Sequence, residues 1–84
     1  MIANTLLANE PLLHVEPLTH RERQMAQAVA RGLRNRQIAM EFGISEETVK
    51  KHLATIYGKL AISGRVALAV LVLRGGLQDD RVAA

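Results

Sequence analysis

Residues 35–60 read NRQIAMEFGISEETVKKHLATIYGKL and carry the strongest indication of the fold. Apolar residues recur at helical spacing over 35–42 and again over 46–60, and only Gly43-Ile44-Ser45 separates the two patterns. Glycine after the first pattern allows a left-handed turn, and serine is a favoured N-cap for the second. Two helices joined by so short a link have the spacing of a helix-turn-helix.

Apolar side chains on one face of each helix predict how the pair packs. The first helix buries Ile38, Ala39 and Phe42, and the small Ala39 is expected where the two helices cross. Ile44 and Val49 take the two positions of a hydrophobic staple at the start of the second helix. The predicted buried stripe of the second helix comprises Val49, Leu53, Ile56 and Leu60.

Two further helices complete an all-α domain of four helices. Thr19 and Glu22 have the spacing of a capping box at the start of a helix over 20–31. An apolar run before two glycines predicts the last helix over 65–74. The predicted organisation is a linker or N-terminal arm over 1–17, the domain over 18–76 and a frayed tail over 77–84.

The positive charge of the chain is concentrated in this domain. The whole sequence of 84 residues has a formal charge of +3. Residues 18–76 hold ten Lys and Arg against four Asp and Glu, which gives a formal charge of +6. A basic centre between acidic flanks favours a polyanionic partner, and nucleic acid is the default. Charge by itself also fits a basic surface that is only solvated.

The composition argues against several other functional classes. A chain without cysteine has no disulfide framework or thiolate metal site, and it fits a reducing cytoplasm. The longest apolar run has eight residues, far below the roughly 18 that span a bilayer, and no signal peptide is evident. Two aromatic residues are too few for a base-stacking platform. The three histidines lack metal-ligand spacing and no nucleophile–base pair is apparent, so we expect neither an enzyme nor a cofactor.

The face of the second helix opposite its apolar stripe carries residues suited to reading DNA. An α-helix fits the major groove, where base edges present distinguishable donors and acceptors. Lysine reaches guanine acceptors or phosphates, and alanine or threonine contacts a thymine methyl group. A glycine on this face lowers helix stability by about 1 kcal/mol relative to alanine. Close approach of the helix backbone to DNA or to another helix would explain why a glycine is present. The residues predicted to face outward are Glu47, Lys50, Lys51, Ala54, Thr55 and Gly58.

Two acids precede two lysines at the leading end of this helix. Glu46 and Glu47 lie in the first turn, where the helix dipole favours negative charge. Each lies four residues before a lysine, Lys50 or Lys51, so we expect two ion pairs worth about 0.2–0.5 kcal/mol each. On DNA the lysines would turn to phosphate or guanine, and Glu47 could accept a hydrogen bond from cytosine N4.

The segment LRNR at 33–36 predicts a contact with the DNA backbone. Asn35 is a favoured N-cap for the helix that follows. A helix N-terminus with free backbone N–H groups, flanked by Arg34 and Arg36, suits a phosphate. Lys59 is a candidate for a second phosphate contact.

His52 interrupts the apolar pattern beside Leu53. We interpret it as a partly buried histidine held by a hydrogen bond. A phosphate contact or a pH-sensitive packing element is the alternative.

Every residue between Arg65 and Arg74 is apolar. A small domain covers only one side of such a helix, and the uncovered side favours a partner surface. Two-fold dimerisation through this helix would present two reading helices to a two-fold-related DNA site. Coverage by the N-terminal arm is the alternative. The predicted dimer contacts are Val66, Val70, Leu73 and Arg74.

Together, several motifs resemble the LuxR-type, or FixJ/GerE-like, helix-turn-helix domain. They are LTHRE, GLRNRQIA, GISEETVKKH, IYGKL and the arginine that opens the last helix, and the resemblance covers about 18–76. It implies a four-helix domain that binds duplex DNA in the major groove and dimerises through its fourth helix. It also implies a cytoplasmic bacterial regulator, either stand-alone or the C-terminal domain of a response regulator or quorum-sensing regulator. The implied contacts are Asn35 and Arg36 to the DNA backbone, and Lys50, Lys51, Ala54, Thr48 and Lys59 from the third helix.

The sequence departs from the family pattern in the loop before the last helix. Ala61 stands where the family often has glycine, so it must avoid the left-handed conformation or accept a cost of about 1 kcal/mol. Gly64 stands where a serine often precedes the arginine, and glycine is an acceptable N-cap. We also expect Glu22 to pair with Arg65 and so to tie the first helix to the last.

A protein-interaction module of the same fold is the alternative function. Such a module would bind another regulator or RNA polymerase, and it would show little affinity for DNA at moderate salt.

Overall fold

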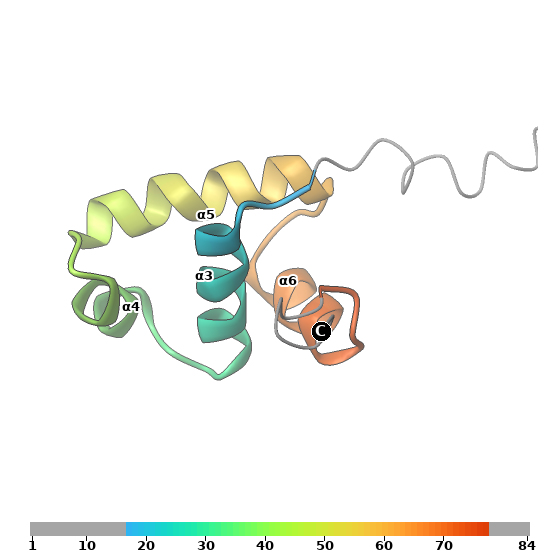
Figure 1. Cartoon of the computed structure of the whole chain (residues 1–84), viewed down its shortest axis with the longest axis horizontal. Helices are drawn as coiled ribbons and strands as arrows, with labels where there is room; N and C mark the ends of the chain where they lie inside the picture. The colour runs from blue at the N-terminus through green and yellow to red at the C-terminus, as the bar shows by residue number, and fades with distance from the viewer. Residues whose placement is uncertain (1–16, 78–84) are drawn as a thin grey trace, which may run out of the picture.

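The computed structural model describes residues 17–77, and this part of the chain contains four helices and no strand. The helices predicted over 35–42 and 46–60 are confirmed at both ends. The other two helices end one residue earlier than predicted, because Arg31 and Arg74 are their C-cap residues. The predicted N-terminal arm and tail lie almost wholly outside the described residues. The helices are α3 (His20–Ala30), α4 (Asn35–Phe42), α5 (Glu46–Leu60) and α6 (Arg65–Leu73) (Figure 1).

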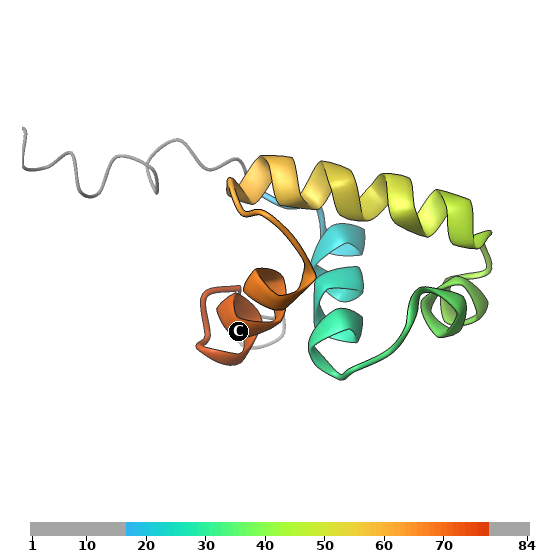
Figure 2. The same ribbon diagram turned by 180° about the vertical axis from the view of Figure 1, so that it is seen from behind.

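The longest helix, α5, extends across the top of the molecule in Figure 1. α3 runs beneath α5 and crosses it, and α4 and α6 lie on opposite sides of α3 (Figures 1 and 2). α3 packs against each of the other three helices, and α4 also packs against α5. α3 is therefore the helix that joins the α4–α5 helix-turn-helix pair to α6.

The apolar core lies where the four helices meet. The predicted stripe of α5 is confirmed, because all four of its residues are buried. In α4, Ile38 and Ala39 are buried as predicted, whereas Phe42 is half-buried and packs against the edge of the core together with Ile44. α3 contributes four buried residues, as many as α5, and α6 contributes one fully buried residue. These are Met25, Ala26, Ala28 and Val29 from α3 and Leu68 from α6.

Short-range capping signals form as the sequence predicts. Thr19 Oγ1 accepts a hydrogen bond from the N–H of Glu22 at 3.0 Å, and Glu22 Oε1 accepts one from the N–H of Thr19 at 2.8 Å. Ser45 Oγ accepts a hydrogen bond from the N–H of Thr48 at 3.0 Å at the start of α5. Gly43 ends α4 in the left-handed conformation, with a φ of 69°. The helix boundaries are thus set by contacts between near neighbours in the chain.

The prediction that Asn35 caps α4 is wrong. Asn35 is the first residue of α4, and the N-cap is Arg34, whose backbone N–H donates to Gln37 Oε1 at 2.8 Å. The Asn35 amide oxygen instead accepts a hydrogen bond at 2.8 Å from Nη1 of Arg65. Nη2 of Arg65 donates to the Leu33 carbonyl at 2.6 Å. A guanidinium from α6 therefore takes the acceptor that a side-chain cap would use.

Ala61 ends α5 in the left-handed conformation, with a φ of 57°. It therefore accepts the predicted cost of about 1 kcal/mol that a Cβ atom imposes there. The N–H of Ala61 donates to the Gly58 carbonyl at 3.3 Å, and that of Ile62 donates to the Tyr57 carbonyl at 3.0 Å. Gly64 is the N-cap of α6 as predicted, with an extended backbone that any residue adopts.

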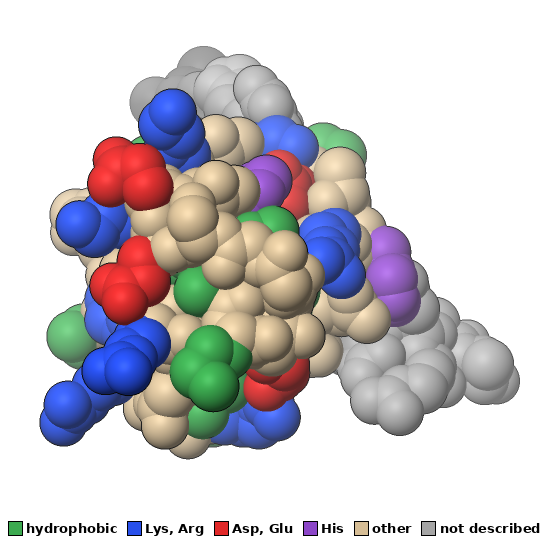
Figure 3. Space-filling view, turned by 90° about the vertical axis from the view of Figure 1, so that its left-hand side faces the viewer, with side chains coloured by type: hydrophobic (Ala, Val, Ile, Leu, Met, Phe, Trp, Pro, Cys, Tyr) green, Lys and Arg blue, Asp and Glu red, His purple; other side chains and the backbone are tan. Residues whose placement is uncertain are grey.

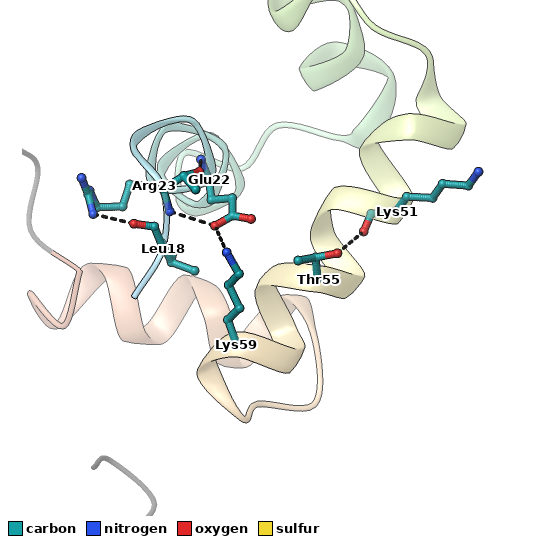
Figure 4. Close-up of polar contacts among 7 residues, drawn as sticks. Leu18, Glu22, Arg23, Lys51, Thr55 and Lys59 are labelled. Atoms are coloured by element: carbon teal, nitrogen blue, oxygen red, sulfur yellow. Dashed lines mark hydrogen bonds and ion pairs between the residues drawn. The ribbon is translucent and has the colours of Figure 1, made fainter. Parts of the chain in front are cut away.

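Glu22 pairs with Lys59 and not, as predicted, with Arg65. Glu22 Oε1 lies 2.9 Å from Lys59 Nζ and also accepts the hydrogen bond from Thr19, so one carboxylate ties the start of α3 to the end of α5 (Figure 4). Only 12% of the Glu22 side chain is exposed. Burial alone raises the pKa of Glu22, but the hydrogen bond from Thr19 and the Lys59 ammonium outweigh it and hold the pKa below its ordinary value.

Glu22→Gln is expected to lower the free energy of unfolding at neutral pH by about 1–3 kcal/mol, because Lys59 loses a charged partner in a mostly buried site. The folded-state pKa of Glu22 is lowered, so its contribution is present above the unfolded-state pKa and is lost as pH falls through the folded-state pKa. The difference between the variant and the unmodified chain should therefore shrink in acid. Denaturant unfolding followed by circular dichroism over a pH series measures it.

Glu41→Gln is the matched control for this experiment. Glu41 lies 2.9 Å from Arg31, but the Arg31 and Glu41 side chains are 57% and 47% exposed. Solvent screens such a pair, so its loss should change the free energy of unfolding by about 0–1 kcal/mol. Equal losses in the two glutamine variants would contradict a special role for Glu22.

Candidate nucleic-acid interface

The face of α5 that points away from the core presents the predicted DNA-reading residues. Residues at these positions recur every three or four residues along the helix, so they share one side of it. α5 has 15 residues, and its buried stripe anchors the opposite side to the core. The exposed set is Glu47, Lys50, Lys51, Ala54 and Thr55. The structure therefore brings these five predicted residues onto one accessible surface.

The lysines of this surface have no ion-pair partner within residues 17–77. The predicted pairs of Glu46 with Lys50 and of Glu47 with Lys51 do not come within the 4.0 Å that defines an ion pair, so this prediction is wrong. The two acids still lie in the first turn of α5, where the helix dipole favours them. Both ammonium groups are thus available to a ligand without first breaking a contact.

The two predicted threonine contacts differ in their surroundings. Thr55 is exposed, and its hydroxyl donates to the Lys51 carbonyl at 3.2 Å, which leaves its methyl group and lone pairs for other contacts (Figure 4). Thr48 is half-buried and belongs to the cap of α5, where its Oγ1 accepts a hydrogen bond from Ser45 Oγ at 2.9 Å. Thr48 therefore supports the helix start, whereas Thr55 lies on the outward face.

Lys59 differs from the other lysines of α5 because its ammonium points into the protein. Figure 4 shows its side chain directed at Glu22, whereas Lys51 extends away from the helices. Only 23% of the Lys59 side chain is exposed, and the ion pair occupies its charge. The structure thus places Lys59 in the internal polar network and apart from the outward surface.

The start of α4 gathers hydrogen-bond donors. Arg34 and Arg36 are exposed, and Asn35 between them is half-buried and bound to Arg65. Within residues 17–77, the backbone N–H groups of Asn35, Arg36 and Gln37 have no acceptor in hydrogen-bonding geometry. Such a helix start favours an anion, since the N–H groups and the dipole both point toward it.

His52 and Gly58 are two further residues of α5 to which the sequence analysis gave a role. His52 is exposed, so the interpretation of a partly buried histidine is wrong. A Cβ atom on Gly58 would meet no atom of the described chain within 4 Å apart from its chain neighbours and the adjacent backbone of α5. The absence of a side chain there is therefore not required by packing among residues 17–77.

The end of the molecule formed by α4 and the start of α5 carries charges of both signs. Figure 3 views this end and shows Glu side chains among the Lys and Arg side chains. A Glu carboxylate repels a phosphate as strongly as a Lys or Arg side chain at the same distance attracts it. Attraction to a polyanion on this face therefore depends on which phosphates lie next to the cations.

α6 exposes much of its apolar surface. Val66 is 77% exposed, Leu73 is 73% exposed and Val70 is 41% exposed, and Arg74 is also exposed. These are the four residues predicted for a dimer interface. An apolar patch of this kind is unfavourable in water, so it favours association with another surface.

Sequence reasoning missed one exposed apolar side chain and two arginine contacts between helices. Met40 of α4 is 75% exposed. Arg21 of α3 donates from Nη2 to the Phe42 carbonyl at 3.0 Å and lies 4.6 Å from the centre of the Phe42 ring. The Arg65 contact with Asn35 spans 30 residues of sequence, so no local pattern signals it.

The described residues offer no site for a metal ion. Within residues 17–77, no group of three His, Cys, Asp or Glu side chains is placed to hold one. In the same part of the chain, no single helix is long and apolar enough to cross a membrane. α5 and α6 meet that criterion only when taken together as a pair bent by 63°, and only by length and composition.

Comparisons with known proteins identify a family and several similar regulatory proteins. The model for "Bacterial regulatory proteins, luxR family" matches residues 16–72. The "Probable transcriptional regulatory protein SgaR" of Hyphomicrobium methylovorum is 49% identical over 72 residues, which cover 82% of this chain and 33% of that protein. The transcriptional regulatory protein UhpA of Escherichia coli is 46% identical over 54 residues, 64% of this chain and 28% of that protein. The nitrate/nitrite response regulator protein NarP of Escherichia coli is 44% identical over 57 residues, 68% of this chain and 26% of that protein.

This chain spans a third or less of the length of each of these relatives. The family match includes the capping box of α3, the turn at Gly43, all of α5 and most of α6. It therefore covers the elements that build the core and the outward face of α5. On this combination of match and geometry, the chain belongs to the luxR family of bacterial regulatory proteins.

Proposed function

We propose that this regulator binds specific sites on duplex DNA as a two-fold dimer, with α5 of each copy in the major groove. The observation that carries the proposal is the outward face of α5, where Lys50 and Lys51 are exposed and have no ion-pair partner within residues 17–77. The opposite face of the same helix is buried, so the helix cannot turn these lysines away. A rigid helix with an open basic face suits the groove.

The residues of this face have distinct proposed roles. Lys50 and Lys51 bind guanine acceptors or phosphates, and the methyl groups of Ala54 and Thr55 contact thymine or the sugar-phosphate backbone. Glu47 accepts a hydrogen bond from cytosine N4 and repels DNA that lacks cytosine at that position. The combination of donors, methyl groups and one acceptor distinguishes base pairs better than lysine alone.

The start of α4 is the proposed second contact. Arg34 and Arg36 bind phosphates through their exposed guanidinium groups, and Asn35 with the adjacent backbone N–H groups binds a phosphate between them. Contacts of this kind fix the orientation of the protein on the duplex and read no sequence by themselves. Thr48 would act indirectly, because it holds the start of α5.

Dimerisation through α6 would pair two such surfaces. Val66, Val70 and Leu73 supply an exposed apolar face that a second copy covers, with Arg74 at its edge. A two-fold dimer matches a two-fold-related DNA site. We further infer that the regulator acts in the bacterial cytoplasm, with RNA polymerase as a candidate partner. The same apolar face supports the alternative of a protein-interaction module, which the salt dependence of DNA binding tests.

Lys50→Ala is expected to weaken binding to a duplex selected from a random library by about tenfold or more, because one base or phosphate contact is lost. The slope of the logarithm of affinity against the logarithm of salt concentration should become shallower by about one. Gel-shift or fluorescence-anisotropy titrations at several salt concentrations measure both quantities.

Arg31→Ala is the control for charge, since Arg31 belongs to the exposed pair with Glu41 and has no proposed DNA contact. It should change affinity much less than Lys50→Ala. Full affinity in a folded Lys50→Ala variant would remove Lys50 from the interface. Binding by the unmodified chain that does not depend on salt would instead favour the protein-interaction module.

Glu47→Ala is expected to raise the affinity for random duplex DNA while reducing the preference for the selected site, because a repulsive charge and a base contact are lost together. Competition of labelled site DNA against random DNA measures the ratio. Glu46→Ala removes the same charge one residue earlier and should leave that ratio nearly unchanged. An unaltered ratio in Glu47→Ala would show that Glu47 only stabilises the start of α5.

Leu73→Glu is expected to weaken dimerisation by at least about tenfold, because a charge would be buried in the apolar contact. Sedimentation equilibrium measures the dimer dissociation constant. Met40→Glu is the matched control, since Met40 is exposed to a similar degree but lies on α4. Dimerisation that is unaffected by Leu73→Glu would exclude this face of α6.

A further inference from the structure

Arg65 occupies a position that its own helix does not favour. It is the first residue of α6, where the helix dipole disfavours a cation. Its side chain leaves α6 and reaches the turn between α3 and α4. There Nη1 donates to Asn35 Oδ1 at 2.8 Å and Nη2 donates to the Leu33 carbonyl at 2.6 Å, both in a partly buried setting. The hydrogen bonds that favour an arginine at position 65 are therefore made at the start of α4 and not within α6.

This contact fixes the orientation of the Asn35 side-chain amide. A guanidinium is a donor only, so the amide oxygen of Asn35 has to face Arg65. The amide NH2 group then faces away from Arg65 and keeps its two N–H donors. The second hydrogen bond, to Leu33, holds the backbone two residues before Asn35 and prevents the guanidinium from following a rotation of the amide.

The contact also removes the acceptor that would close the start of α4. Asparagine favours the N-cap position because its side-chain oxygen accepts a hydrogen bond from an N–H group of the first turn. The Asn35 oxygen already accepts a hydrogen bond from Arg65. The first backbone hydrogen bond of α4 runs from the Ile38 N–H to the Arg34 carbonyl at 2.9 Å. The three earlier N–H groups stay open within residues 17–77. The start of α4 is thus a set of donors with no competing acceptor.

We propose that Arg65 is a positioning residue for DNA binding: by holding the amide oxygen of Asn35, it keeps the Asn35 NH2 group and the first-turn N–H groups of α4 directed to a DNA phosphate. This inference rests on the proposed function of the chain. Arg65 itself does not touch DNA in this arrangement. Its effect on affinity passes through Asn35.

A double-mutant cycle tests this dependence. Arg65→Gln should weaken binding to selected and random duplexes by a similar factor of about ten, because a phosphate contact is the same on both. In an Asn35→Ala background, the same Arg65→Gln change should weaken binding by less than about twofold. Equal factors in the two backgrounds would overturn the proposal, because Arg65 would then act independently of Asn35.

Arg21→Gln is the matched control. Arg21 also donates from a guanidinium to a backbone carbonyl of α4, but at Phe42, at the opposite end of that helix. The variant removes the same charge and a comparable inter-helix contact. It should change DNA affinity much less than Arg65→Gln, and its effect should be the same with and without Asn35. A loss of affinity equal to that of Arg65→Gln would mean that general support of α4 explains both variants.

A measurement without DNA separates positioning from loss of structure. Without Arg65, Asn35 is free to take the N-cap position and to accept a hydrogen bond from the Gln37 N–H, so hydrogen exchange at that N–H should slow in Arg65→Gln. If Arg65 only stabilises the fold, exchange should accelerate throughout α4, and the proposal would be overturned. If exchange slows but the effects of Arg65→Gln and Asn35→Ala on DNA affinity simply add, Arg65 orients Asn35 but has no role in DNA binding, and the proposal is overturned. Failure of the unmodified chain to bind duplex DNA would overturn the proposed function, and with it the proposed role of Arg65.

Discussion

α5 must bury one side in the core while its opposite side stays open, and the other helices are arranged around it accordingly. Helices of eight to fifteen residues are marginal in water by themselves, so they need shared packing. α3 supplies that packing because it crosses beneath α5 and contacts both α4 and α6. The buried stripe of α5 fixes the rotation of the helix about its axis. Every residue on the outward face is placed by that rotation.

Polar contacts between helices divide the basic residues into two groups. Lys59 and Arg65 are directed inward, where they bind Glu22 and Asn35 and so join α5 to α3 and α6 to α4. Lys50 and Lys51 are directed outward and have no ion-pair partner in the described chain. Net charge alone therefore overstates the number of cations available to an anionic partner, because part of the charge serves the fold.

Local features of the fold were predictable because they depend on residues close together in the chain. The capping box at Thr19 and Glu22, the N-cap at Ser45 and the left-handed turn at Gly43 each involve residues no more than five positions apart. The periodic stripe of α5 likewise predicted which of its sides is buried. The exposed set on the opposite side followed from the same helical periodicity.

Helical periodicity and capping residues were enough to predict the four helices, their ends within one residue, the turn between α4 and α5 and the side of α5 that faces outward. The tertiary packing selects Lys59 as the partner of Glu22, 37 residues away, and Arg65 as the partner of Asn35, 30 residues away. It also decided that Asn35 does not cap α4 and that His52 is exposed. Capping and periodicity act over one turn of helix, whereas the choice among several polar partners depends on how the helices cross. That crossing is set by packing of the whole core, which no short stretch of sequence contains.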